Sequence, residues 1–271
     1  MPSDLTTLPI LITGASSGIG RAAAIACARA GMPVVLAARR ADKLADAVRE
    51  IESRGGRALA FECDVADAAQ CRAAVEACVE KFGSIYSVFA NAGYGQNAAV
   101  HEMTDADLRR MFEVNLFGTT NVVNAALKHM LPARRGHVLI CSSCLARMPI
   151  MRGGAYSATK AAQHHLARAM RLELAPLGVC VSSVHPIGTR TEFFDVAAGA
   201  ARGDGASTPP PSMFMQDASF VADCVVRCLR RPKPEAEVWP GMMSKLLRVV
   251  MAGLVIAPGI GDWMMRRAER R

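Results

Sequence analysis

Residues 9–20 decide the fold of this chain, and they read Pro-Ile-Leu-Ile-Thr-Gly-Ala-Ser-Ser-Gly-Ile-Gly. The apolar run over residues 9–13 predicts a buried strand, and residues 19–30 predict a helix. Between them, glycines at positions 14, 18 and 20 allow a tight turn and let a phosphate group approach the backbone closely. The start of the helix adds free N–H groups and the positive end of the helix dipole. The order of strand, glycine loop and helix therefore predicts a dinucleotide-binding loop.

Short apolar runs alternate with longer alanine-rich stretches along most of the remaining chain. We expect further strands at residues 33–38, 58–63, 85–90, 137–141 and 179–185. We expect further helices at residues 42–53, 67–82, 104–131 and 156–175. The strands are almost uninterrupted apolar runs, which is typical of parallel strands covered on both faces. This alternation predicts an α/β fold with a doubly wound, Rossmann-type parallel sheet.

The chain has 271 residues, of which 51% are hydrophobic and 21% are charged, so we exclude global disorder and expect one domain. We place a catalytic domain at residues 1–240, with a substrate loop at about residues 190–217, where glycine, alanine and proline accumulate. Residues 241–271 form an extension that is first apolar and then basic. Its apolar run over residues 249–261 is too short to span a bilayer, and we expect no signal peptide.

The charges and the cysteines exclude several functional classes. The net charge of +8 permits an anionic partner, and a phosphate-bearing cofactor satisfies it as well as nucleic acid does. Aromatic residues make up 5% and do not alternate with basic residues, so we expect no nucleic-acid partner. Nine scattered cysteines predict a reducing, cytoplasmic location without a disulfide framework. Cys141 and Cys144 form a Cys-x-x-Cys pair without a second ligand pair, so we expect no metal site.

The end of the second strand indicates which dinucleotide binds. NAD-binding units usually place an acid there, which holds the ribose hydroxyls. This chain has Ala38, Arg39 and Arg40 instead. Because Arg39 can bind a 2′-phosphate through charge-assisted hydrogen bonds, NADP(H) is favoured over NAD(H) as the cofactor. The alternative is that both arginines are merely solvated at the end of a strand.

A tyrosine and a lysine four residues apart indicate proton transfer. Tyr156 and Lys160 open a predicted helix, so their side chains share one face. A phenol has an ordinary pKa of about 10, and a neighbouring ammonium lowers it toward neutral pH. Ser143 follows the fifth strand, at the edge of the sheet where such folds hold their ligands. Its hydroxyl is placed to bind a substrate carbonyl oxygen.

Taken together, these motifs resemble the short-chain dehydrogenase/reductase family in its ordinary-length form, over about residues 8–191. Asp64-Val65 is similar to the acidic pair that contacts adenine, and Asn91-Ala92-Gly93 to the motif that buttresses the sheet beside the cofactor. The resemblance implies cofactor contacts from Thr13, Gly14, Ser16, Ser17, Gly18, Ile19, Gly20, Arg39, Asp64, Val65, Asn91, Ala92, Gly93, Tyr156, Lys160, Pro186, Ile187, Thr189 and Thr191.

The resemblance also implies a role for each catalytic residue. Tyr156 exchanges the proton with the carbonyl or alcohol oxygen. Lys160 lowers the pKa of Tyr156 and holds the nicotinamide ribose, and Ser143 polarises the carbonyl. Asn115, which matches the helical asparagine of the family's proton relay, holds a water that links Lys160 to solvent. Ser142 is a second hydroxyl nearby, but the spacing to the tyrosine in this family favours Ser143.

One position departs from the family pattern. After the sixth strand the family usually has Pro-Gly, whereas here Ile187 follows Pro186. The backbone N–H of Ile187 can still face the nicotinamide carboxamide, and Thr191 can still reach the carboxamide or the pyrophosphate.

We therefore expect an NADP(H)-dependent oxidoreductase that interconverts a carbonyl and an alcohol on a largely apolar small-molecule substrate. Soft side chains at Met213, Phe214 and Met215 suit a lid over such a substrate. Two alternatives remain open: a non-catalytic dinucleotide-binding regulator, and a lipid- or steroid-type reductase that works at a membrane surface.

The remaining partners depend on two surfaces. In the family, the helical stretches at 104–131 and 156–175 commonly pair between subunits, which implies a homodimer or homotetramer. The second stretch carries small residues that permit close helix approach, namely Ala161, Ala162, Ala167 and Ala169. The apolar residues 239–261 precede Arg266, Arg267, Arg270 and Arg271 and must be buried somewhere. We favour the substrate pocket or a second subunit, and the alternative is peripheral contact with a membrane.

Overall fold

The computed structural model describes residues 4–194, 197, 212 and 215–269. A parallel sheet runs through the centre of this described part, with its strands in the order β3-β2-β1-β4-β5-β6-β9. The strands are β1 (Ile10–Thr13), β2 (Val34–Ala38), β3 (Ala58–Glu62), β4 (Ser87–Ala90), β5 (Gly136–Cys141), β6 (Val179–Val184) and β9 (Glu237–Val238). The predicted doubly wound parallel sheet is confirmed, and the predicted strands agree with the observed ones to within two residues.

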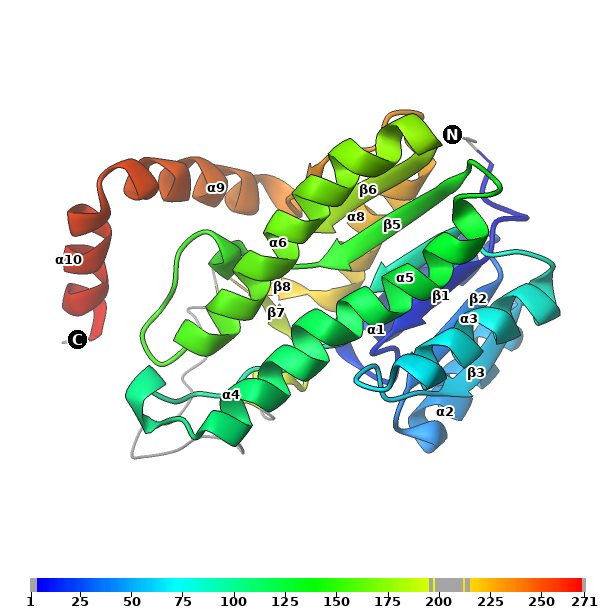
Figure 1. Ribbon diagram of the computed structural model, residues 1–271, viewed down its shortest axis with the longest axis horizontal. Coiled ribbons are helices and arrows are strands. Elements are labelled where there is room, and N and C mark those ends of the chain that lie inside the picture. The colour runs from blue at the N-terminus through cyan, green and yellow to red at the C-terminus, as the bar shows by residue number, and fades with distance from the viewer. Residues whose placement is uncertain (1–3, 195–196, 198–211, 213–214, 270–271) are drawn as a thin grey trace.

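Helices cover both faces of the sheet (Figure 1). One face packs against α1 (Gly18–Arg29), α2 (Ala41–Glu52) and α8 (Ala218–Arg230), and the other against α3 (Ala68–Phe82), α5 (Gly118–Met130) and α6 (Gly154–Leu174). Along β1 the side chains alternate: Ile10 and Ile12 join the first core, and Leu11 joins the second. All three are fully buried, which explains why the strand reads as one uninterrupted apolar run.

The helix predicted over residues 104–131 contains an irregular turn. It consists of α4 (Asp105–Phe112), the π-helical turn η2 (Glu113–Phe117) and α5. Thr104 caps its start by accepting a hydrogen bond from the N–H of Asp107. Turns of the π type are rare and often mark functional sites, and this one contains Asn115.

Shorter elements surround the C-terminal edge of the sheet. They are η1 (Val100–Glu102), η3 (Cys144–Ala146) and a small parallel sheet of β7 (Gly188–Arg190) and β8 (Met215–Asp217), whereas η4 (Ala175–Leu177) directly precedes β6 at the opposite edge. Much of the expected substrate loop at residues 190–217 lies outside the described residues, including Met213 and Phe214 of the expected lid. Met215 begins β8.

The chain ends in two helices, α9 (Gly241–Ile256) and α10 (Pro258–Glu269), which extend away from the sheet (Figure 1). Only one stripe of α9 is covered, by residues that include the buried Ser244 and Met251. Within the described residues, none of the helices has the length and apolar character needed to cross a membrane.

Candidate active site

The glycine loop is held by atoms of two adjacent strands. The Thr13 hydroxyl accepts hydrogen bonds from the backbone N–H groups of Asn91 and Ala92, both at 3.0 Å. In return, the Asn91 side-chain amide donates to the Thr13 carbonyl at 3.0 Å. A Cβ atom added to Gly20 would lie 2.4 Å from the carbonyl oxygen of Gly14. The loop therefore leaves no room for a side chain there, and its backbone fits a closely bound pyrophosphate.

Arg40 contacts this loop directly. Its guanidinium donates to the hydroxyls of Ser16 at 2.9 Å and Ser17 at 2.7 Å, and pairs with Glu192 at 2.8 Å. The sequence analysis favoured Arg39 for the 2′-phosphate and assigned nothing to Arg40 or Glu192. The two consecutive arginines were the feature of the sequence from which the contact of Arg40 could have been found. No feature of the sequence indicated Glu192.

Arg39 points to a different neighbourhood. Burial raises the pKa of Asp64, the first residue of the expected adenine-binding pair, but hydrogen bonds from Ala66 and Arg110 and the charges of Arg110 and Arg39 lower it below its ordinary value. The Asp64 carboxylate is paired with Arg110 at 3.0 Å and accepts from the backbone N–H of Ala66. Next to it, Val65 is buried against Gly118, where an added Cβ would lie 2.6 Å from a Val65 methyl group. Arg39 thus lies on the side of the expected adenine, and its contact with a 2′-phosphate stays a prediction.

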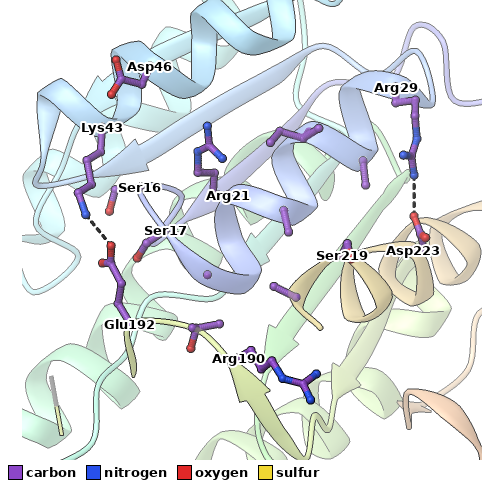
Figure 2. Close-up of a pocket in the computed structure, with 16 residues that line it drawn as sticks. Ser16, Ser17, Arg21, Arg29, Lys43, Asp46, Arg190, Glu192, Ser219 and Asp223 are labelled. Atoms are coloured by element: carbon purple, nitrogen blue, oxygen red, sulfur yellow. Dashed lines mark hydrogen bonds and ion pairs between the residues drawn. The ribbon is translucent and has the colours of Figure 1, made fainter. Parts of the chain in front are cut away.

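A cleft of about 620 Å³ borders the glycine loop along α1 and α8, as Figure 2 shows. At its rim, Glu192 pairs with Lys43 at 2.6 Å. Hydrogen bonds from Lys43 and Arg40 lower the pKa of the Glu192 carboxyl to about 2, so it is ionised. The cleft lies outside the catalytic crevice, because none of Ser143, Tyr156 and Lys160 lines it.

The three expected catalytic side chains meet at the C-terminal edge of β5. The Ser143 side chain lies beside the Tyr156 phenol, and its hydroxyl accepts a hydrogen bond from the backbone N–H of Leu145 at 3.1 Å. Lys160 is buried, its ammonium lies 5.5 Å from the centre of the Tyr156 ring, and it donates to the Cys141 carbonyl at 2.7 Å. Tyr156 and Lys160 come from the first two turns of α6, as their spacing predicts.

The pKa of the phenol shifts in the opposite direction to our expectation. Burial raises the pKa of Tyr156, and the hydrogen bond with Ser143 offsets only part of this effect. Burial also lowers the pKa of the Lys160 ammonium, because a charged form loses its hydration. Desolvation is the largest effect on both groups, and a lowering of the Tyr156 pKa by Lys160 stays a prediction.

The neighbouring Ser142 serves the backbone instead. Its buried hydroxyl donates to the carbonyl of Lys160 at 2.9 Å and thereby anchors α6 to β5. Of the two serines, Ser143 lies beside Tyr156, and its catalytic role stays a prediction.

Asn115 lies beside this group, in the π-helical turn. Its side-chain amide accepts a hydrogen bond from the Tyr94 N–H and donates one to the Tyr94 carbonyl, both at 2.9 Å. The backbone carbonyl of Asn115 accepts from the Gln163 side chain at 2.6 Å. A Cβ added to Gly93 would lie 3.0 Å from the side-chain oxygen of Asn115 and 3.6 Å from the Lys160 nitrogen. Gly93 thus keeps open the space between Asn115 and Lys160.

The segment after β6 closes the crevice. Ile187 is buried, and the carbonyl of Pro186 accepts from the N–H of Cys144 at 3.0 Å, which ties this segment to the one that carries Ser143. Thr191 lies over the glycine loop, because a Cβ added to Gly18 would approach its methyl group to 3.0 Å. The departure at Ile187 therefore leaves Thr191 next to the expected pyrophosphate position. Thr189, which lies between Ile187 and Thr191 in the chain, is also buried.

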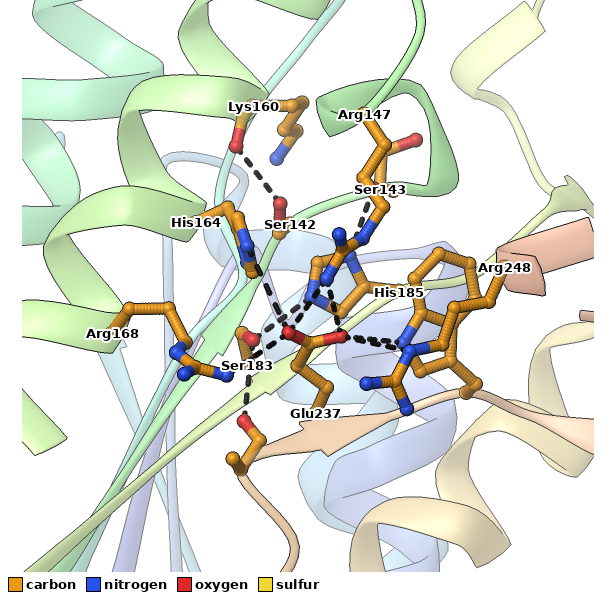
Figure 3. A network of polar contacts seen from close by, with 12 residues as sticks. Ser142, Ser143, Arg147, Lys160, His164, Arg168, Ser183, His185, Glu237 and Arg248 are labelled. Carbon is orange, nitrogen blue, oxygen red and sulfur yellow. Dashed lines mark hydrogen bonds and ion pairs between the residues drawn. The ribbon is translucent and has the colours of Figure 1, made fainter. Parts of the chain in front are cut away.

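A buried carboxylate, which the sequence analysis missed, supports the site from behind (Figure 3). The Glu237 carboxylate accepts from Arg147 with both oxygens, at 2.7 and 2.8 Å, and from the Trp239 indole at 3.0 Å. Arg248 of α9 lies 3.4 Å away. Burial raises the pKa of Glu237, but the hydrogen bonds from Trp239 and Arg147 and the nearby positive charges lower it to about 2.

His185 connects this carboxylate to Ser143. Its ring stacks on Trp239 with centres 4.7 Å apart, and its Nδ1 lies 3.0 Å from the Ser143 carbonyl oxygen. His164 contacts it edge-on at 5.0 Å. Burial lowers the pKa of both histidines to about 4, so both are neutral at neutral pH. A lone acid in the sequence Glu-Val-Trp-Pro carries no signal of this network.

The nine cysteines are free, and Cys141 and Cys144 are both buried. Over the residues that the structure describes, no cluster of three or more potential metal ligands occurs.

The fold and the site together define a class. A glycine cradle, a Tyr-Lys pair and a serine at the C-terminal edge of a doubly wound sheet form a site for a nicotinamide dinucleotide and a substrate undergoing redox chemistry.

Comparisons with known proteins identify the family within this class. A family model described as short chain dehydrogenase matches residues 9–199. An uncharacterized oxidoreductase of Listeria monocytogenes is 33% identical over 188 residues, which cover 69% of this chain and 76% of that protein. The solved structure of an alcohol dehydrogenase from the archaeon Thermococcus sibiricus, complexed with 5-hydroxy-NADP, is similar with a TM-score of 0.74 at 29% identity, covering 85% of this chain and 94% of that one.

A second solved structure, a short chain dehydrogenase/reductase from Burkholderia phymatum in complex with NAD, has a TM-score of 0.79 at 25% identity and covers 90% of this chain and 93% of that one. This chain belongs to the short chain dehydrogenase family. It is accordingly an NAD(P)-dependent oxidoreductase.

Proposed function

We propose that the protein is an NADP(H)-dependent oxidoreductase that interconverts a carbonyl and an alcohol on a largely apolar substrate. The observation that carries this proposal is the grouping of Ser143 and Tyr156 with the buried Lys160 ammonium, which lies 5.5 Å from the centre of the Tyr156 ring. The three groups lie at the same sheet edge as the glycine cradle, so a dinucleotide bound there places its nicotinamide near them.

The chemistry divides between the cofactor and the protein. A bound nicotinamide supplies or accepts the hydride at the carbonyl carbon. During reduction, the Tyr156 hydroxyl donates its proton to the carbonyl oxygen, and the Ser143 hydroxyl donates a hydrogen bond to the same atom. Lys160 stabilises the phenolate that this transfer leaves. Asn115 and the open space beside Gly93 provide a place for a water that returns the proton to Tyr156 through Lys160.

Two arginines support the preference for NADP(H). Both Arg39 and Arg40 are exposed at the end of β2, and Arg40 already binds the hydroxyls of the glycine loop. The solved relatives include complexes of both dinucleotides, so the preference rests on these two side chains. A 2′-phosphate placed between them gains charge-assisted hydrogen bonds, whereas a free ribose hydroxyl gains fewer.

The surroundings of the reacting groups suit an apolar substrate. The Tyr156 ring packs against Phe193 with centres 5.2 Å apart. Beyond Ser143, a small apolar cluster contains Cys144, Ile187 and Met251. Such walls favour a hydrophobic carbonyl compound with one polar group directed at Tyr156.

We also propose a homodimer or homotetramer that pairs through α5 and α6. Ala161, Ala162 and Ala169 of α6 are at least partly exposed and permit close approach of a second helix. Ala167, which we expected on the same surface, is buried in the core of the subunit and does not contribute. Light scattering at micromolar concentration measures the assembly directly, and a monomer there contradicts this part of the proposal.

The function is tested by following NADPH and NADH oxidation with a panel of aliphatic, aromatic and polycyclic aldehydes and ketones. We expect turnover with NADPH and one or more apolar carbonyl compounds. Binding of NADPH without turnover of any substrate would instead indicate the dinucleotide-binding regulator.

A further inference from the structure

We infer that the C-terminal arm, formed by α9 and α10, docks on the surface of an anionic lipid bilayer, from which the site takes its apolar substrate. The second half of this inference rests on the proposed function, whereas the docking itself does not.

The arm has two different faces. On its inner face, Met251 is buried against Cys144, Ile187 and Trp239 and so belongs to the fold. Its outer face consists of large apolar side chains in contact with solvent. They are Met242, Leu246, Val249, Val250, Ile256, Ile260 and Trp263.

The outer face is a continuous surface. Residues 242, 246, 249 and 256 follow the three- and four-residue spacing of a helix, so their side chains form one stripe along α9. Val249 is 68% exposed and Ile256 is 86% exposed, so neither side chain contributes to the core of the fold. Apolar patches of this kind on a protein surface mark sites of interaction.

The charges on the arm favour an anionic partner. Arg248 is paired with Glu237, whereas the other basic side chains described on α9 and α10, namely Lys245, Arg266 and Arg267, are exposed, and the acidic one is Asp262. Apolar side chains flanked by cations are typical of helices that lie in the interface of an anionic membrane.

Trp263 strengthens this assignment. It is exposed on α10, and the guanidinium of Arg267 lies 5.4 Å from its ring centre. Tryptophan is enriched at the boundary between lipid and water, because its ring is apolar and its N–H remains hydrated.

A second copy of the chain fits this face less well. A twofold contact buries the same patch of both subunits, so the cations of one arm would meet those of the other. Lipid headgroups with negative charge neutralise the same cations. The described helices also cannot span a bilayer, which leaves binding along its surface.

The position of the arm connects docking with catalysis. Met251 on the inner face touches Cys144, the residue directly after Ser143. The bilayer surface would therefore lie one helix away from the reacting groups. A substrate dissolved in the bilayer reaches the site along the arm without crossing bulk water.

The docking is tested by vesicle flotation of the full chain with phosphatidylcholine vesicles, alone or mixed with phosphatidylglycerol. We expect binding to the mixed vesicles that weakens in high salt. Replacing Val249→Asp together with Ile256→Asp should reduce this binding at least tenfold. The matched control is Leu177→Asp in η4, a side chain that is 40% exposed outside both the arm and the proposed subunit interface, which should leave binding unchanged.

A second variant tests the charges without touching the apolar stripe. Replacing Arg266→Glu and Arg267→Glu should weaken binding on the order of fivefold for each lost cation. Thermal melts of all variants confirm that they fold. The inference is overturned if the folded protein binds neither kind of vesicle. It is also overturned if the Val249→Asp, Ile256→Asp pair changes only the oligomeric state in light scattering, because the face then belongs to a second copy.

Activity assays separate the docking from the proposed function. A protein that floats with vesicles but reduces no carbonyl compound retains the docking and loses the proposed function. A protein that reduces water-soluble carbonyl compounds but does not bind vesicles loses the docking alone. Where both hold, vesicle-dissolved substrate should be consumed faster by the parent chain than by the Val249→Asp, Ile256→Asp pair, with equal rates on soluble substrate.

Discussion

Two sides of the site are stabilised in different ways. Near β1, backbone atoms and short side chains hold the glycine loop. Near β9, the buried Glu237 carboxylate binds the residues that pack behind Ser143. The contacts of the loop involve residues of two neighbouring strands, such as Thr13 and Asn91. The carboxylate of Glu237 instead collects Arg147, Trp239 and Arg248, and Arg147 is 90 residues away in the chain.

The difference shows two ways of making a site rigid. The loop depends on close packing, so added atoms should damage it. The carboxylate network depends on charge in a buried place, so it should be sensitive to the loss of that charge and to acid. Substitutions on each side, and between them, can therefore break or sharpen the comparison.

The largest effect is expected between the two sides, at Tyr156→Phe. This change removes the hydroxyl that donates the proton, and loss of a general acid costs about 10²- to 10⁴-fold in rate. The affinity for NADPH, measured by fluorescence titration, should change little because the ring remains. Turnover at the parent rate would contradict the proposed role of Tyr156.

The second effect concerns the β9 side. Glu237→Gln keeps the shape of the side chain but leaves Arg147 without its buried partner. We expect the free energy of unfolding to fall by about 2–3 kcal/mol, measured by urea denaturation. Arg168→Gln is the matched control, since Arg168 is half-exposed and lies 3.4 Å from the same carboxylate, and it should change stability by less than about 1 kcal/mol.

The same network should make the protein labile to acid. Glu237 has a lowered pKa of about 2, below its ordinary 4.5, and His164 and His185 have pKa values of about 4, below their ordinary 6.5. In each case the unfolded chain binds the proton more readily, so stability is full above the ordinary pKa and is lost as the pH falls below it. Melting temperatures should decline from about pH 6.5 downward. Glu237→Gln should flatten the part of the decline between pH 4.5 and 2, and an unchanged slope there would refute this assignment.

A smaller effect on the β1 side distinguishes the two arginines. Arg39→Ala and Arg40→Ala should each weaken NADPH binding more than NADH binding, by about 10- to 100-fold for a lost charged contact. Arg40→Ala should also weaken NADH somewhat, because it removes the bonds to Ser16 and Ser17. If both variants affect NADPH and NADH equally, the two arginines are surface charges and the preference for NADP(H) loses its support.

The smallest effects come from a pair of helical glycines. Gly20→Ala should cost about 1–3 kcal/mol and weaken the cofactor, because its Cβ would collide with the Gly14 carbonyl. Gly253→Ala in α9 meets nothing within 4 Å and should raise stability by about 0.5–1 kcal/mol. Equal effects of the two changes on the melting temperature would show that steric packing is not what distinguishes the loop from the arm.

The order of strands and helices could be predicted from the sequence alone, because it depends on local patterns, and the same local order predicts the glycine loop and the catalytic set. A strand, a glycine turn and a helix are consecutive in the chain, and Tyr156 and Lys160 share one helix face by spacing alone. Even the distinction between Ser142 and Ser143 followed from distance along the chain.

The three-dimensional packing was needed to show which groups support the site from outside these motifs. Glu237, Arg147 and Arg248 are far apart in the chain, and their attraction exists only once folding removes them from water together. The raised pKa of Tyr156 has the same origin, since burial is a property of the packed molecule. The destination of the apolar C-terminus also required the structure, because the sequence shows that these side chains need cover but not that one face of α9 stays bare.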